Sequence, residues 1–197
     1  MKVIGLTGGT GCGKSTAAAV LREFGALIVD ADAISRGLTA AGGRAIPAIR
    51  EAFGPEMISP DGSMNRKAMA ALVFVDAHAL QRLNGILHPM IWQALREKIA
   101  EAEKIGAPVC VLDVPLLFET GMEALCDRVL CVVVSPQEQL RRVMQRDGLT
   151  LEQAKARVAS QMPAEEKAAR SDDVISTEGT LEETRELLTR LWESYQV

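Results

Sequence analysis

The chain carries the stretch Gly8-Gly9-Thr10-Gly11-Cys12-Gly13-Lys14-Ser15 near its N-terminus, which matches the pattern G-x-x-x-x-G-K-[ST]. An apolar run, Val3–Leu6, precedes it, and an Ala-rich helical pattern, Thr16–Phe24, follows it and stops at Gly25. Glycines let the backbone wrap closely around phosphate oxygens, and the N-terminus of the following helix favours an anion. A strand, a glycine loop and a helix in this order therefore predict a phosphate-binding loop and a nucleotide site.

Two side chains of this loop have predicted chemical roles. We expect Lys14 to span the β- and γ-phosphates of ATP and the Ser15 hydroxyl to ligate Mg²⁺, the predicted cofactor. Cys12 is read as a small residue that the loop tolerates. The predicted ATP-binding residues are Gly8, Gly9, Thr10, Gly11, Cys12, Gly13, Lys14, Ser15 and Thr16. Such a loop does not by itself choose among kinases, GTPases and ATP-driven machines.

Four further apolar runs have the character of strands. They are Leu27–Val29, Val109–Leu112, Val129–Val134 and a weaker Val174–Ile175. The stronger runs are continuous rather than alternating, as in strands buried on both faces of a parallel sheet. Helical patterns separate the runs, which implies right-handed crossovers. The sequence therefore predicts an α/β fold, a doubly wound five-stranded parallel sheet of the P-loop NTPase type.

Two segments interrupt the alternation. Residues 30–104 contain no convincing strand but have helical patches at Ala45–Phe53, Lys67–Val75 and Ala79–Leu87. This segment is predicted to be a helical insertion at the carboxyl edge of the sheet, where such folds bind ligands. His88-Pro89 is expected just before a separate helix that begins at Met90, with His88 as a capping or packing residue or, alternatively, a substrate contact.

Carboxylates follow two of the predicted strands. The second strand ends in Asp30-Ala31-Asp32 beside the phosphate loop, and strand alternation would place both carboxylates on one side. Asp32 is the candidate to deprotonate an attacking hydroxyl; alternatively, Asp30 caps the next helix and Asp32 is solvated. Asp113, at the end of the third strand, has the form of a Walker B aspartate that holds Mg²⁺ or its water.

The segment Pro115–Phe118 after Asp113 is unusually apolar for an exposed loop. It would line a pocket for an apolar part of the acceptor or simply pack on the sheet.

The second interrupting segment is rich in basic residues. Residues 141–170 carry 7 basic and 4 acidic residues, whereas the whole chain has a net charge of −4. The basic residues are Arg141, Arg142, Arg146, Lys155, Arg157, Lys167 and Arg170. Because phosphoryl transfer needs cations on the developing charge, this segment is predicted to be a lid that closes over the nucleotide. For each residue alone, a solvated helix face is the alternative.

Composition narrows the class of protein. The chain has 197 residues, and its sequence pI near 5.3 argues against a nucleic-acid binder that works by overall charge. Its apolar stretches, such as Val129–Val134, are too short to cross a membrane. None of the four cysteines has CxxC spacing, and no signal-peptide core is evident, so a reducing cytoplasmic location is expected.

The motifs together resemble one family, the dephospho-CoA kinases. Besides the glycine loop and Asp30-Ala31-Asp32, the resemblance rests on Gly62-x-x-Asn65-Arg66, Val73-Phe74, Leu83-Asn84, His88-Pro89, Asp113-Val114-Pro115-Leu116-Leu117-Phe118-Glu119, Arg142-x-x-x-Arg146-Asp147, Arg157-x-x-x-Gln161 and Asp172-Asp173-Val174-Ile175. It implies transfer of the ATP γ-phosphoryl group to the 3′-hydroxyl of dephospho-CoA, the last step of coenzyme A synthesis. ATP and dephospho-CoA are the expected partners, with no nucleic acid or membrane, in a monomer or small homo-oligomer.

The resemblance also implies a three-part layout, similar to that of nucleoside-monophosphate kinases. The core is expected at residues 1–30, 107–140 and 171–197, the helical acceptor-binding subdomain at 31–106 and the lid at 141–170.

Site residues follow from the same resemblance. Asp32 would be the general base, and Arg142, Arg146 or Arg157 would join Lys14 in stabilising charge. The implied acceptor-binding residues are Asp32, Arg66, His88, Pro115, Leu116, Leu117, Phe118 and Glu119. The metal ligands would be Ser15 and Asp113.

This chain departs from the family at two places. Thr10 stands where the family usually has an aliphatic residue, and Ser176-Thr177-Glu178-Gly179 stands where the family typically has asparagine before the glycine. The second departure affects whether a side chain of this loop contacts adenine, whereas backbone contacts could persist.

Two other functions are weighed against this one. A kinase for another small hydroxyl compound would use the same core. A GTPase-like switch would usually carry an Asn-Lys-x-Asp element, and that string does not occur in the sequence.

Overall fold

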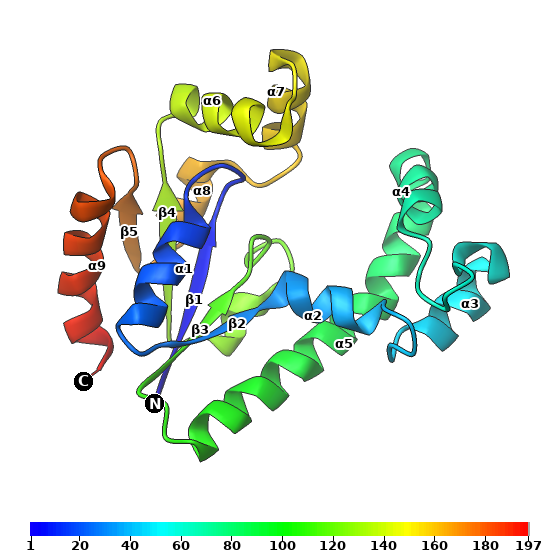
Figure 1. The fold of residues 1–197 in the computed structure, drawn as a ribbon, viewed down its shortest axis with the longest axis horizontal. Coiled ribbons are helices and arrows are strands. Elements are labelled where there is room, and N and C mark those ends of the chain that lie inside the picture. Colours follow the sequence, from blue (N-terminus) through cyan, green and yellow to red (C-terminus); the bar gives the residue numbers. More distant parts are fainter. Residues whose placement is uncertain (197) are drawn as a thin grey trace. The chain divides into compact units, whose positions relative to one another are not determined.

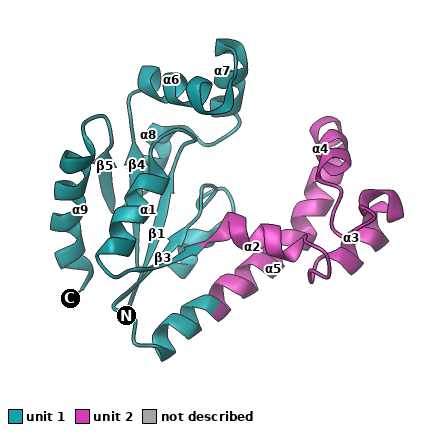
Figure 2. Cartoon of the chain, in the orientation of Figure 1, with its two compact units in different colours: residues 1–29, 98–197 teal, residues 30–97 magenta. Residues whose placement is uncertain are grey.

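The computed structural model describes residues 1–196 and separates into two compact units (Figure 2). Unit 1 comprises Met1–Val29 and Lys98–Val197, and unit 2 comprises Asp30–Glu97.

The sheet of unit 1 has five strands. They are β1 (Lys2–Gly8), β2 (Leu27–Asp30), β3 (Val109–Asp113), β4 (Arg128–Val133) and β5 (Asp173–Ser176). Their order is β2-β3-β1-β4-β5, and the pairing is parallel. The order places β1, with the phosphate loop at its carboxyl end, in the centre of the sheet. The predicted α/β fold with a five-stranded parallel sheet is confirmed.

The three central strands, β1, β3 and β4, are buried on both faces. Ile4, Val111 and Leu130 pack in one cluster with residues of α1 (Lys14–Glu23) and α9 (Leu181–Tyr195). These two helices lie side by side in Figure 1. Cys110 and Cys131, which alternate with the clustered residues along β3 and β4, are also fully buried. Burial on both faces explains why these strands read as continuous apolar runs.

Three helices follow β4. They are α6 (Pro136–Asp147), α7 (Leu151–Ala159) and α8 (Ala164–Ala169); a short 3₁₀ helix, Met122–Leu125, precedes β4. Ser135 caps α6, which ends at Gly148 with a φ of +65°. Thr150 and Gln153 form a capping box at the start of α7. The segment predicted to be a lid therefore begins inside α6 and contains α7 and α8.

Unit 2 is helical. It contains α2 (Ala31–Leu38), α3 (Ile46–Phe53), a 3₁₀ turn (Pro55–Met57), α4 (Arg66–Val75) and most of α5 (Ala77–Lys104). Ile49, Met69 and Ala79 form part of its buried interior. The helical patches expected near residues 45–53 and 67–75 are present.

The break predicted at His88-Pro89 is wrong, because α5 is one continuous helix with Pro89 inside it. Proline lacks an N–H and cannot donate to the carbonyl four residues earlier, so it weakens one turn. The apolar side chains of Leu83, Leu87 and Ile91 are buried on both sides of the proline. That continuous stripe holds the helix together, so no helix begins at Met90 and His88 caps nothing.

The alternation expected for Asp30 and Asp32 is also wrong. Strand β2 ends at Asp30, whose side chain caps α2 by accepting the Ala33 N–H at 3.0 Å. Asp32 is exposed in the first turn of that helix. In addition, β3 lies between β2 and β1, so β2 is not beside the strand that carries the phosphate loop.

Among residues 1–196, no helix is both long enough and apolar enough to span a bilayer.

Candidate active site

The phosphate loop joins β1 to α1, as its sequence predicts. Gly13 caps α1 with a φ of +80°, a region that favours glycine, and a Cβ there would lie 2.9 Å from the Thr177 hydroxyl oxygen. The loop is therefore held against the segment that follows β5, and Gly13 permits the close approach.

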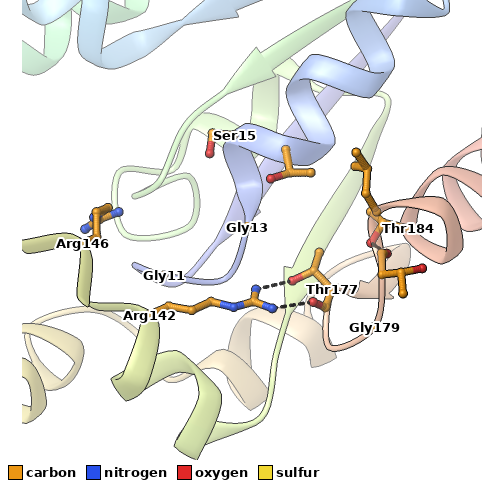
Figure 3. A pocket seen from close by; sticks show the side chains of 11 residues that line it. Gly11, Gly13, Ser15, Arg142, Arg146, Thr177, Gly179 and Thr184 are labelled. Atoms are coloured by element: carbon orange, nitrogen blue, oxygen red, sulfur yellow. Dashed lines mark hydrogen bonds between the residues drawn. The ribbon is translucent and has the colours of Figure 1, made fainter. Parts of the chain in front are cut away.

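A cavity of about 390 Å³ opens beside this loop (Figure 3). Its walls come from three parts of unit 1: the loop and the start of α1, helix α6, and the β5–α9 connection. The lining residues are Gly11, Gly13, Ser15, Thr16, Arg142, Arg146, Thr177, Gly179, Thr180, Leu181 and Thr184. Glycine backbone, hydroxyls and two arginines together form a wall suited to a phosphorylated ligand.

Lys14 and Asp113 form an ion pair between their side chains. Asp113 ends β3, which pairs with β1 so that Leu6 stands opposite Asp113. The side chains of both ion-pair partners are less than one-fifth exposed. The two residues expected to act on phosphate and on the metal are therefore brought together, although they are 99 positions apart in sequence.

Arg142 donates three hydrogen bonds to two residues. Its Nε donates to Glu138 at 2.7 Å, its Nη1 to the Thr177 hydroxyl at 3.0 Å and its Nη2 to the Thr177 carbonyl at 2.7 Å. Hydrogen bonds from Arg141 and Arg142 lower the pKa of the Glu138 carboxyl to about 2. Arg142 therefore has a defined direction at the cavity wall, while Arg141 is exposed and bonds to Glu138 and Gln145.

Arg146 and Arg157 meet at one carboxylate. Arg146 donates to Asp147 at 2.8 Å and to the Thr10 hydroxyl at 3.1 Å, and Arg157 lies 3.1 Å from Asp147. The hydrogen bond from Arg146 holds the pKa of Asp147 below its usual value. Arg146 lines the cavity, whereas Arg157 is connected to it through Asp147.

The predicted lid does not present all its cations to solvent. Lys167 is fully buried: its Nζ donates to the Pro115 carbonyl at 2.6 Å and pairs with Glu119 at 2.9 Å. Glu119 also accepts the N–H of Met162 at 3.0 Å. The expectation that Lys167 belongs to a phosphate-facing set is wrong, because this cation holds the loop after β3 instead.

The apolar residues after Asp113 were expected either to line an acceptor pocket or to pack on the sheet, and the structure divides them between buried and exposed positions. Leu117 and Phe118 are buried, and the guanidinium of Arg170 lies 4.4 Å from the centre of the Phe118 ring. Leu116 is 41% exposed. Packing therefore accounts for two residues of the string, and Leu116 is left accessible to a ligand.

Three predicted acceptor-site residues lie in unit 2, on three different helices. Asp32 is exposed on α2. Arg66 begins α4 and donates to the Thr39 hydroxyl at 2.6 Å. His88 is partly buried on α5, next to the internal Pro89.

The sequence predicted no role for three residues that contact the phosphate loop; of these, Thr177 lines the cavity and Gln139 and Gln161 do not. Thr177 contacts Arg142 and also donates its hydroxyl proton to the Cys12 carbonyl at 2.8 Å. Gln139 and Gln161 hold the backbone carbonyl and N–H of Thr10, each at 2.9 Å. The contacts that these three residues make with the loop join positions 129 to 165 apart, so no local pattern signals them.

The donor set fits a magnesium ion that arrives with a nucleotide. Within residues 1–196, no cluster of three or more His, Cys, Asp or Glu side chains could hold a metal by itself. Mg²⁺ commonly takes one or two protein oxygens together with substrate phosphates and water. The Ser15 hydroxyl and the Asp113 carboxylate supply that number and kind of ligand.

Comparison with known proteins gives a consistent result. Residues 2–183 match the family described as dephospho-CoA kinase. The chain is 47% identical over 182 residues to the dephospho-CoA kinase of Anaeromyxobacter dehalogenans, covering 92% of this chain and 86% of that protein. It is 42% identical over 192 residues to that of Geobacter sulfurreducens, covering 98% of both.

Solved structures agree with the sequence matches. TT1252 from Thermus thermophilus superposes with a TM-score of 0.81 at 36% identity, covering 98% of this chain and 97% of the other. The dephospho-CoA kinase from Campylobacter jejuni gives 0.74 at 27% identity, covering 98% and 96%. A shikimate kinase from Acinetobacter baumannii, at 0.55 and 17% identity over 98% and 92%, shares the fold alone.

Proposed function

This chain belongs to the dephospho-CoA kinase family, and on that premise we propose that it transfers the γ-phosphoryl group of ATP to the ribose 3′-hydroxyl of dephospho-CoA. The products are coenzyme A and ADP, and the reaction is the last step of coenzyme A synthesis. The observation that carries the proposal is the convergence of Lys14, Asp113 and two arginines, Arg142 and Arg146, around the phosphate loop.

ATP binds at the cavity beside the phosphate loop. Backbone N–H groups of the loop and the N-terminus of α1 hold phosphate oxygens, and Lys14 reaches the β- and γ-phosphates. Lys14 pairs with Asp113, which places its ammonium group at the loop.

The arginines stabilise the charge that develops on the transferred group. Arg142 and Arg146 line the same cavity from one helix, and Arg157 supports Arg146 through Asp147. Fixed cations act more strongly in a site that excludes water. Residues 141–170 would form the lid that brings these charges over the phosphates.

Mg²⁺ would be held by Ser15 and Asp113 together with phosphate oxygens of ATP. When bound, it neutralises phosphate charge.

Asp32 acts as the general base. Its carboxylate accepts the proton of the 3′-hydroxyl, a bond forms from that oxygen to the γ-phosphorus, and the bond between the γ-phosphorus and the bridging oxygen of ADP breaks. Arg66, His88 and the string Pro115–Glu119 would bind the acceptor. Within that string, Leu116 is the exposed apolar side chain.

Replacement of Asp32→Asn tests the base. Loss of a positioned base is expected to lower kcat by about 10²–10⁴-fold while the Kd for ATP, measured by calorimetry, stays the same. Asp30→Asn is the matched comparison, because asparagine also caps helices well. Undiminished turnover in Asp32→Asn, or loss of turnover only in Asp30→Asn, would refute the assignment.

A panel of acceptors tests the substrate. With ATP and Mg²⁺, release of ADP should depend on dephospho-CoA and not on adenosine, other nucleosides or shikimate. Equal turnover of another hydroxyl compound would favour a different small-molecule kinase, and a preference for GTP over ATP would favour a switch.

A further inference from the structure

We propose that Thr177 is a positioning residue for phosphoryl transfer, because its hydroxyl links the guanidinium of Arg142 to the phosphate loop. The inference rests on the role of Arg142 in the proposed function and concerns how that arginine is held.

The link consists of three hydrogen bonds around one residue. The Thr177 hydroxyl donates to the Cys12 carbonyl at 2.8 Å and accepts from Arg142 Nη1 at 3.0 Å. The Thr177 carbonyl accepts from Arg142 Nη2 at 2.7 Å. Figure 3 shows the guanidinium directed at Thr177 from α6, with both Arg142 bonds drawn.

The single proton of the Thr177 hydroxyl determines to which partner it donates and from which it accepts. A threonine hydroxyl has one proton, and here the proton goes to the Cys12 carbonyl, so a lone pair is left facing Arg142. A guanidinium has only donors, so it must bind the side of the hydroxyl that accepts. Donation to Cys12 and acceptance from Arg142 therefore support each other.

The backbone of Thr177 is itself held. The Thr177 N–H donates to the Val133 carbonyl at 3.0 Å, which continues the pairing of β4 and β5 by one residue. Thr177 is 5% exposed, and Gly13 of the phosphate loop packs against its side chain. Thr177 therefore fixes the position of Arg142 relative to the sheet and to the loop that would bind the phosphates.

Valine has nearly the shape of threonine but no hydroxyl. In Thr177→Val, Arg142 would keep its bonds to Glu138 and to the residue 177 carbonyl, and would lose the one that ties it to the loop. We expect the charge of Arg142 to be less well placed for the transition state, which lowers kcat more than it raises the KM for dephospho-CoA.

The experiment compares Thr177→Val with Thr177→Ser, which keeps the hydroxyl. We expect kcat to fall about tenfold or more in the valine variant and to stay within about threefold of wild type in the serine variant. Thr189→Val is the matched control, because the Thr189 hydroxyl donates only to the Arg185 carbonyl within α9. Rates are normalised to the number of ATP-binding sites, so partial misfolding does not mimic the effect.

The double variant Thr177→Val/Arg142→Lys tests whether Thr177 acts through Arg142. If it does, the double variant is about as slow as Arg142→Lys alone, since the link has nothing left to position. A wild-type kcat in Thr177→Val, an equal loss in Thr177→Ser, or losses that multiply in the double variant would overturn the inference. A wild-type kcat in Arg142→Lys and Arg142→Ala would instead overturn the proposed role of Arg142.

Discussion

Lys167 illustrates how a single residue can contradict the charge pattern in which it sits. Its segment reads as a basic lid, yet its ammonium group is buried against Glu119 and the Pro115 carbonyl. A lysine stem long enough to reach the loop after β3, and a carboxylate there to receive it, decide this outcome. Sequence neighbours of Lys167 contain neither partner, so charge counting assigned it to the wrong surface.

Replacing Lys167→Met should lower the free energy of unfolding by about 3–5 kcal/mol, because removal of one partner leaves Glu119 charged and poorly solvated. Urea denaturation measures the change. The double variant Lys167→Met/Glu119→Gln should recover part of the loss. Lys155→Met, which breaks an exposed pair with Glu152, is the matched control and should change stability by less than about 1 kcal/mol.

The same variant should show a characteristic pH dependence. Burial opposes ionisation of Glu119, but hydrogen bonds from Lys167 and the Met162 N–H outweigh it and hold its pKa below the usual value. Such a carboxyl contributes stability above its unfolded pKa, near 4.5, and the contribution is lost as the pH falls through the folded pKa. The difference in stability between wild type and Lys167→Met should therefore shrink as the pH is lowered from 6. A constant difference would mean that the pair does not control stability.

Helices α6 and α7 are connected to the phosphate loop by amide side chains. Gln139 of α6 and Gln161, two residues after α7, hold the two backbone groups of Thr10. This arrangement gives the lid proposal a physical basis, because any ordering of the loop by phosphate would also restrain the segment that carries Gln161.

Hydrogen exchange tests whether the helices within residues 141–170 become restrained when nucleotide binds. Addition of a non-hydrolysable ATP analogue with Mg²⁺ should slow amide exchange across residues 141–170, most strongly at 150–161. Peptides of β3 and β4, already buried, should not change. Gln161→Leu should reduce the slowing at 150–161. Unchanged exchange across 141–170 on adding nucleotide would argue against closure of a lid.

Helix α5 shows how packing overrides a local signal. Proline at the first turn of a helix is common, and His88-Pro89 fits that pattern. The buried stripe on both sides of Pro89 instead keeps one helix from Ala77 to Lys104. The patches on each side of the proline are visible in the sequence, but whether they join depends on what their apolar faces contact.

Across the whole molecule, burial controls the reactivity of the cysteine thiols. All four cysteines are free; Cys12, Cys110 and Cys131 are buried and Cys126 is half-buried. Burial raises the pKa of Cys110 and Cys131 to about 11 and that of Cys126 to about 12. At pH 8 little thiolate is therefore present in the folded chain.

Native protein should react slowly with Ellman's reagent at pH 8, whereas all four thiols should react at once in denaturant. The native rate should increase as the pH is raised, because the pKa values lie above 8. A reducing agent should leave the melting temperature unchanged. Immediate reaction of several thiols in the native state would show that the interior opens more readily than its packing implies.

Local features could be predicted from the sequence alone. The glycine loop, the five strand-forming runs and the helical patches near residues 16–24, 45–53 and 67–75 follow from spacing and backbone requirements within a few neighbouring residues. Which distant groups meet depends on the tertiary fold. The parallel order β2-β3-β1-β4-β5 brings Asp113 to Lys14, and the residue after β5, Thr177, to Cys12, 165 positions away. Crossovers let strands far apart in sequence share one sheet edge, so such partners carry no local signal.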